Sequence, residues 1–186
     1  MSNAVRTSSH LDVVRGVLRR IATDVGTILG HSIALGDARC ERALARPAGE
    51  GAIHISFKLA LRRAGAEETH GCLLLPLHEA ITWAGFLLML SEETVAARRE
   101  DTTLEPEAKH ALLEIGNLIA GATHTALSEL GLPGWRAVSR GCQGVRAGVR
   151  PAFPYVEGSE LLVGHVEAST GALPAARWIL VLPPPA

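Results

Sequence analysis

The chain has 186 residues, 47% of them hydrophobic, with a formal net charge of −1. This composition excludes general disorder, and the balanced charge excludes a global attraction to nucleic acid or acidic lipid. Cys40, Cys72 and Cys142 lack C-x-x-C spacing, so we expect neither a disulfide framework nor a metal site. With no signal-peptide pattern and no membrane-length apolar run, we expect a cytoplasmic protein without membrane insertion or nucleic-acid partner.

The first half of the chain predicts one helix followed by strands. Apolar residues at helical spacing predict a helix over residues 9–30, with Ser9 as a candidate N-cap and Gly30 at its end. Residues 32–46 have a weaker pattern, for which we expect one strand. Residues 52–61 alternate apolar and polar side chains, which predicts a strand with one covered and one wetter face, and residues 71–76 predict its neighbour.

Two further helices are predicted in the middle of the chain. Residues 78–90 are apolar nearly all round, so this helix should be buried or lie at an interface. Residues 91–103 are charged and read as an exposed connector. Pro106 fits the first turn of a long helix over residues 106–130, where its missing N–H costs nothing.

Strands return after this long helix. We expect them at residues 137–144, 160–167 and 177–182, with 145–149 as a further candidate. The order of helix, strands, helices and strands predicts an α+β fold, in which helices cover one side of an antiparallel or mixed sheet.

The helix over residues 106–130 has two distinct faces. Its apolar stripe consists of Leu112, Ile115, Leu118, Ile119, Ala122, Ala126 and Leu130. The opposite face carries His110, Glu114, Asn117, Gly121, His124, Thr125 and Ser128. This second face has one carboxylate and one carboxamide three residues apart, which places both on one helical edge. Gly116 and Gly121 each cost the helix about 1 kcal/mol relative to alanine, so we expect a close contact at each.

The same order of residue types occurs in the first helix. Residues 22–30 align with residues 112–120, and an acid, an aliphatic residue, glycine, a polar residue and two aliphatic residues recur in both. This match predicts a pseudo-twofold repeat of one helix-plus-strands unit, at about residues 9–76 and 104–182 of a single domain over 1–186. Thr27 stands where the second copy has Asn117, so the first copy is expected to be weak or inactive.

The run from Leu113 to Ala122 contains Glu114, Asn117 and Gly121 in the spacing E-x-x-N-x-x-x-G. It resembles the signature of the CheC/CheX chemotaxis phosphatases, and the predicted order of elements is similar to the single-motif CheX type. The resemblance implies a phosphatase that acts on the phosphoaspartate of a CheY-like response regulator. In that family the Asn positions the attacking water and the Glu pairs with the regulator's Lys, roles that fall on Asn117 and Glu114.

The resemblance also bears on the surroundings of the motif. His110, Gly121 and His124 are expected to contact the partner, with Gly121 allowing close backbone approach. The Mg²⁺ is expected in the response regulator, with no cofactor in this chain, and a homodimer is implied. His110 replaces the family's usual Asp or Ser, and a usual proline is absent near Ala137. An alternative is a docking module that binds a response regulator or flagellar-switch component without hydrolysis.

Overall fold

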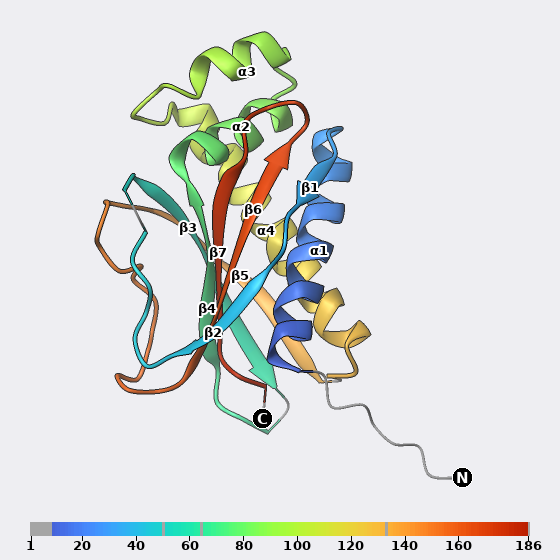
Figure 1. Ribbon diagram of the computed structural model, residues 1–186, viewed down its shortest axis with the longest axis vertical. Helices are drawn as coiled ribbons and strands as arrows, with labels where there is room; N and C mark the ends of the chain where they lie inside the picture. Colours follow the sequence, from blue (N-terminus) through green and yellow to red (C-terminus); the bar gives the residue numbers. More distant parts are fainter. Residues whose placement is uncertain (1–8, 50, 64, 133, 186) are drawn as a thin grey trace.

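The computed structural model describes residues 9–49, 51–63, 65–132 and 134–185. Figure 1 shows helices on one side of a single curved sheet. The helices are α1 (His10–Leu29), α2 (Leu77–Leu87), α3 (Glu92–Arg98) and α4 (Pro106–Glu129). The strands are β1 (Ile33–Leu35), β2 (Arg39–Ala43), β3 (His54–Arg63), β4 (Thr69–Pro76), β5 (Trp135–Val145), β6 (Leu161–Thr170) and β7 (Ala176–Leu182). The predicted α+β fold is therefore confirmed.

All strand pairs in the sheet are antiparallel. The strands follow the order β1–β6–β7–β4–β3–β5, and β2 also pairs with β6. With β2 as the strand beside β6, the order reads β2–β6–β7–β4–β3–β5. Exchanging β2 with β5, β6 with β3 and β7 with β4 gives the same order in reverse. The first strand of each half thus pairs with the second strand of the other half, as expected for a pseudo-twofold repeat whose halves share one sheet.

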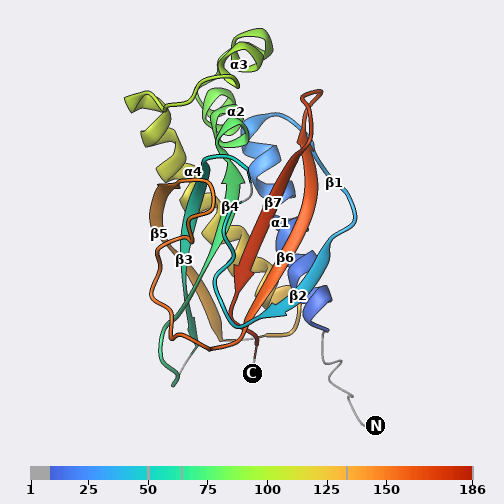
Figure 2. The same cartoon turned by 60° about the vertical axis from the view of Figure 1, so that its left-hand side comes forward.

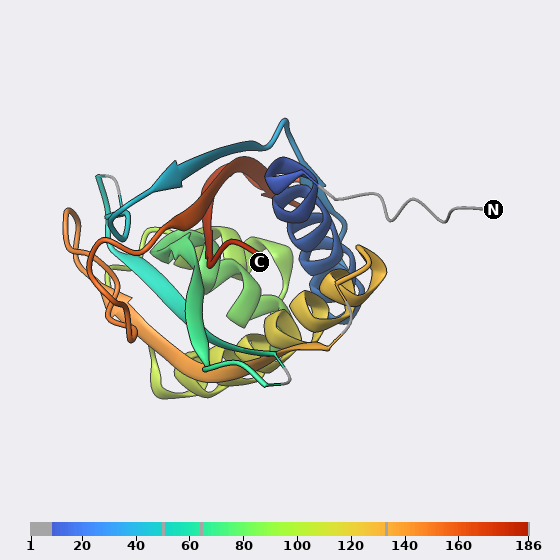
Figure 3. The ribbon, with the colours of Figure 1, turned by 90° about the horizontal axis from the view of Figure 1, so that it is seen from below.

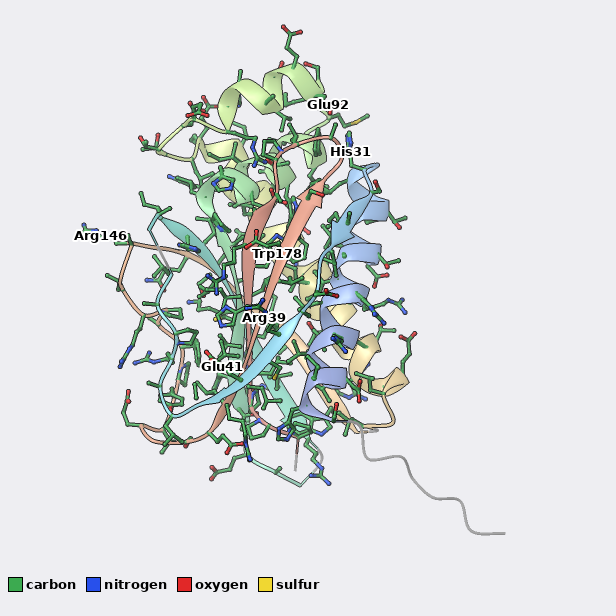
Figure 4. The ribbon with its side chains drawn as sticks, viewed as in Figure 1. His31, Arg39, Glu41, Glu92, Arg146 and Trp178 are labelled. Atoms are coloured by element: carbon green, nitrogen blue, oxygen red, sulfur yellow. The ribbon has the colours of Figure 1, made fainter. Side chains whose placement is uncertain are left out.

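Helices α1, α2 and α4 cover the inner face of the sheet, and α3 packs on α2. Helices α1 and α4 pack side by side across it, and α2 lies at one end between the sheet and α4 (Figures 2 and 3). Trp83 of α2 and Trp178 of β7 are fully buried there, with ring centroids 5.0 Å apart in an edge arrangement (Trp178 is labelled in Figure 4). As predicted, α2 is buried on nearly all sides.

The ends of the two long helices follow the sequence signals. Ser9 caps α1 in a reciprocal capping box with Asp12, and Gly30 ends it with φ 71°. Pro106 occupies the first turn of α4. These signals act locally, which is why the sequence predicted them.

The prediction that residues 91–103 form only an exposed connector was wrong, because this segment contains α3. The Ser91 hydroxyl accepts from Thr94 N, two acids occupy the first turn, and Arg98 occupies the last turn. Val95 is fully buried against Gly85. A helix of seven residues has too few turns to show a clear apolar periodicity. Only its capping residue and its terminal charges could have predicted it from the sequence.

Two strand predictions were also wrong in detail. Residues 32–46 contain two short strands, β1 and β2, which both pair with β6 and are separated by residues 36–38, where the register along β6 shifts by one residue. Conversely, the expected strand at 137–144 and the candidate at 145–149 are replaced by one strand, β5, whose ladder with β3 shifts between Phe57 and Leu59. Gly141 has φ 80° at this irregularity, which keeps one strand continuous through it.

The first half of the expected wetter face of β3 is covered, whereas Lys58 and Arg62 further along it are half-buried and exposed. His54 and Ser56, the first two polar positions of this face, are buried. Residues 146–160 lie over the outer face of the sheet, where Phe153 joins a second apolar cluster with β4, β6 and β7. Arg46 lies 5.8 Å and 5.6 Å from the ring centroids of Phe153 and Tyr155 and donates to Pro151 O. Long loops therefore cover His54 and Ser56, which the alternation of apolar and polar residues in this strand had predicted to face solvent.

Candidate functional site

The polar face of α4 is open to solvent where the motif lies. His110, Glu114, Asn117 and Gly121 are all exposed. No hydrogen bond or ion pair joins the side chains of Glu114 or Asn117 to the rest of the described chain. Beneath them, Leu112, Ile115 and Ile119 are fully buried and hold the helix on the sheet. The fold therefore presents a carboxylate and a carboxamide together on a fixed helix, with their hydrogen-bonding groups unused.

The two glycines of this helix have different surroundings. A Cβ on Gly116 would lie 3.2 Å from Ser139 Oγ and 3.6 Å from Phe57 Cδ1, so this glycine lets α4 pack closely on β5 and β3. A Cβ on Gly121 would meet nothing within 4 Å. The close contact expected at Gly116 is present within the fold, whereas Gly121 leaves open space on the motif face.

The two histidines of the predicted partner surface also differ. His110 is exposed on the same face as Glu114. His124 is half-buried, and its Nδ1 lies 3.1 Å from the carbonyl oxygen of Trp135. This contact ties α4 to the start of β5, so His124 has a structural partner that its position on the helical face did not indicate.

A groove of about 460 Å³ lies beside the motif. It runs between the first turns of α4, the connector before α4 and the adjoining ends of β3 and β5. Ile53 and Leu113 are 40% and 44% exposed along it, and Lys109 stands at its wall. Burial raises the pKa of the Cys142 thiol in this lining, which keeps it protonated and unsuited to nucleophilic chemistry. The sequence did not predict this groove, because its lining comes from four separate segments, at residues 53–55, 77, 102–113 and 142–144.

The equivalent residues of α1 are bound to their own surroundings. The Asp24 carboxylate accepts from Arg20 Nε at 2.8 Å, and Arg20 also pairs with Glu129 of α4 at 2.7 Å. The Thr27 hydroxyl donates to the Thr23 carbonyl at 2.7 Å. The first copy thus lacks both the carboxamide and the unpaired carboxylate of the second.

Two further observations limit the chemistry of the described residues. Among them, no three His, Cys, Asp or Glu side chains are grouped so that they could hold a metal ion. None of the helices they form is long and apolar enough to cross a membrane.

The sequence matches no protein-family model and no curated protein. The fold, however, is similar to several solved structures. FliY of Thermotoga maritima is 17% identical, with a TM-score of 0.64 over 90% of this chain and 84% of that chain. The FliM middle domain of H. pylori is 13% identical, with a TM-score of 0.62 over 94% and 91%. The chemotaxis protein CheX of Desulfovibrio desulfuricans is 13% identical, with a TM-score of 0.54 over 91% and 96%.

These similarities extend over nearly the whole of this chain and of the compared chains. The chain therefore has the fold shared by CheX, CheC-like, FliY and FliM middle-domain proteins. This confirms the fold that the motif resemblance implied.

Proposed function

We propose that this protein belongs to the CheC/CheX phosphatases and hydrolyses the phosphoaspartate of a CheY-like response regulator. The observation that carries the proposal is the Glu114–Asn117 pair, exposed on α4 and free of partners within the described chain. The fold shared with CheX supports it. The contrast with α1 adds support, because the corresponding Asp24 and Thr27 are bonded within the molecule.

Asn117 acts on the water in this mechanism. An acyl phosphate has a good leaving group, so a helper protein contributes mainly by holding water in line with the breaking bond. The Asn117 carboxamide both accepts and donates hydrogen bonds and does not titrate, so it orients the water at any physiological pH. The water oxygen attacks phosphorus, the bond to the aspartate oxygen breaks, and inorganic phosphate leaves.

Glu114 and the surface around it position the regulator. The Glu114 carboxylate pairs with a lysine of the regulator. The Mg²⁺ expected in the regulator would neutralise charge on the phosphoryl oxygens. Gly121 leaves room for the regulator's backbone, and the apolar groove beside Leu113 receives the adjoining surface. The homodimer implied by the resemblance stays a prediction.

A second candidate function is docking without hydrolysis. FliM middle domains share this fold, and solved structures include a FliG–FliM complex and a FliM–SpeE complex from H. pylori. His110, in place of the family's Asp or Ser, is the feature of this chain that favours the alternative. The motif face would then serve only as a binding surface.

Phosphate release from phosphorylated CheY-like regulators tests the proposal. We expect the wild-type protein to accelerate release over autodephosphorylation. Asn117→Ala should lower the rate by about 100-fold or more, because the water loses its orientation. Binding to the regulator, measured by calorimetry, should be retained.

Thr27→Ala is the matched control, since it truncates the equivalent residue of α1 and should leave the rate unchanged. If wild-type protein binds a regulator but never accelerates its dephosphorylation, the docking function replaces the enzymatic one. Equal loss of rate in Thr27→Ala and Asn117→Ala would instead indicate a general structural effect.

A further inference from the structure

Three adjacent strands concentrate positive charge. Strands β3, β4 and β5 contain Lys58, Arg62, Arg63, Arg136 and Arg140, and their sequences contain no aspartate or glutamate. The chain as a whole has a net charge of −1, so the remainder has an excess of acidic residues. This local basic surface is hidden in the overall composition.

Four of these cations share the outer face of the sheet. Ser139 points toward α4 on the inner face, so its neighbours Val138 and Arg140 point outward, together with Arg136. Strand register places Arg136 opposite Arg62 and Val138 opposite Ala60. Lys58, opposite the outward-facing Cys72 of the second apolar cluster, completes the patch, which lies at the β5 edge of the sheet (Figure 2).

The Glu68 carboxylate forms ion pairs with two cations of this patch. Glu68, just before β4, accepts from Arg62 and from Arg140 Nη2 at 3.0 Å, and the two guanidinium groups lower its pKa. Arg136 is exposed, and no hydrogen bond or ion pair links the side chains of Arg136 or Lys58 to the rest of the described chain. Positive charge therefore exceeds negative charge on this face.

The fold does not require this arrangement. Like charges directly opposite each other on neighbouring strands are destabilising, and Arg62 with Arg136 is such a pair. Val138, between Arg136 and Arg140, is 38% exposed. A stretch of strand that alternates cation, apolar residue and cation on one face matches an extended ligand that alternates acid, apolar residue and acid.

We propose that the outer face of β5 and β3, formed by Lys58, Arg62, Arg136, Val138 and Arg140, binds an acidic extended segment of a partner protein. The partner's carboxylates pair with Arg136 and Arg140, and its apolar side chain lies on Val138. This surface is on the opposite side of the sheet from α4, so it is separate from the Glu114–Asn117 site and does not depend on the proposed function.

Other occupants fit the surface less well. Two copies of the patch facing each other would bring Arg136 and Arg140 against the same residues of the second copy. A nucleic acid would meet the Glu68 carboxylate among the cations, and the patch offers no aromatic side chain for base stacking. An acidic peptide can leave the Glu68 ion pairs intact while it neutralises Arg136.

Fluorescence anisotropy of the full chain with a labelled peptide containing repeats of Glu-Ser-Val-Ser-Glu tests this proposal. We expect saturable binding at about 50 mM salt that weakens at about 300 mM salt, because exposed charges are screened. Arg136→Glu should weaken binding about tenfold or more. Its melting temperature should not fall, because the substitution converts a repulsive cross-strand pair into an attractive one.

Arg39→Glu is the matched control. Arg39 is an exposed arginine on β2, at the opposite edge of the sheet (Figure 4), and its substitution should change affinity by less than about twofold. The proposal is overturned if Arg136→Glu binds the peptide as tightly as wild type, or if a Lys-Ser-Val-Ser-Lys peptide binds equally well. It also fails if wild type does not bind the acidic peptide at about 1 mM, or if it prefers an oligonucleotide of equal charge.

Discussion

Gly116 and Gly121 lie five residues apart on α4, but their surroundings assign them different roles. Gly116 packs against Ser139 and Phe57, so the fold itself uses the missing side chain. Gly121 is exposed with nothing near the position of a Cβ. A helix position with open space and a glycine gives up stability that alanine would supply. Within the proposed function, Gly121 leaves space for the regulator's backbone, which accounts for a glycine at a position where alanine would make the helix more stable.

Gly121→Ala should therefore raise stability and lower function. We expect the free energy of unfolding to increase by up to about 1 kcal/mol in urea titrations, because alanine favours the helix. Regulator binding and phosphate release should both fall, because the added methyl group obstructs the partner. Gly164→Ala is a contrasting variant, since its Cβ would collide with Val14 and should destabilise the protein. If Gly121→Ala gains stability and retains full activity, Gly121 does not provide clearance.

Glu114→Lys should act on association. The substitution places a positive charge opposite the regulator's lysine, so the regulator's affinity should fall by about tenfold or more. The Glu114 side chain makes no hydrogen bond or ion pair within the described chain, so the melting temperature should stay nearly unchanged. Calorimetric titration with the regulator measures the effect, and an unchanged affinity would remove Glu114 from the interface.

At the scale of elements, a buried carboxylate joins α2 to the hairpin of β6 and β7. Glu79 is fully buried and accepts from Trp83 Nε1 at 3.1 Å, Thr170 Oγ1 at 2.6 Å and Arg99 Nη1 at 3.2 Å. Arg99 follows α3 and also donates to Pro174 O. Desolvation by burial raises the pKa of the Glu79 carboxyl, while Thr170 and Arg99 act in the opposite direction. This cluster fixes α3 and the connector that forms one wall of the motif groove.

The raised pKa of Glu79 gives its contribution to stability a definite pH dependence. An acid with a raised folded pKa binds its proton more tightly in the native state, so its contribution is lost as pH rises above the ordinary value of about 4.3. We expect the free energy of unfolding of wild type minus that of Glu79→Gln to decrease between about pH 4.5 and about pH 8. Urea titrations at several pH values measure this difference. A difference that stays flat above about pH 4.5 and falls at lower pH would show that Arg99 and Thr170 outweigh burial.

At the scale of the whole molecule, the two halves share a topology but differ in chemistry. Gly26 and Gly116 occupy equivalent positions, and both are buried and closely packed. Asp24 is held by Arg20, whereas Glu114 is unpaired in the described chain. Helix α1 ends at Leu29, so it lacks the turn in which α4 carries Gly121. The repeat thus preserves packing, and within the described chain the second half carries the unpaired carboxylate and carboxamide that the first half lacks.

Restoring the motif residues in α1 should therefore not restore a site. In an Asn117→Ala background, we expect Asp24→Glu with Thr27→Asn to leave phosphate release at the level of Asn117→Ala alone. Arg20 would still pair with the acid, and the missing helical turn would still alter the approach of a partner. Single-turnover phosphate release checks this expectation, and recovery of the wild-type rate would show that side-chain identity alone separates the two halves.

Sequence reasoning succeeded where the signals are local or strictly periodic. Ser9, Gly30 and Pro106 lie at the helix boundaries they predicted, and Leu112, Ile115 and Ile119 are buried as their spacing required. It failed where distant segments determine the outcome. The burial of His54 and Ser56, the division of residues 32–46 into two strands and the His124–Trp135 contact each depend on chain far away in sequence.

The sequence by itself determined the α+β plan, the two faces of α4 and the motif that makes Glu114 and Asn117 candidates for chemistry. These follow from periodicity and spacing, which a single helix expresses without any partner. The tertiary structure alone decided that Asp24 is paired while Glu114 has no ion-pair partner in the described chain, and that Gly116 is packed while Gly121 is open. It also placed Arg62 opposite Arg136, because cross-strand register and helix packing are set by the assembled sheet.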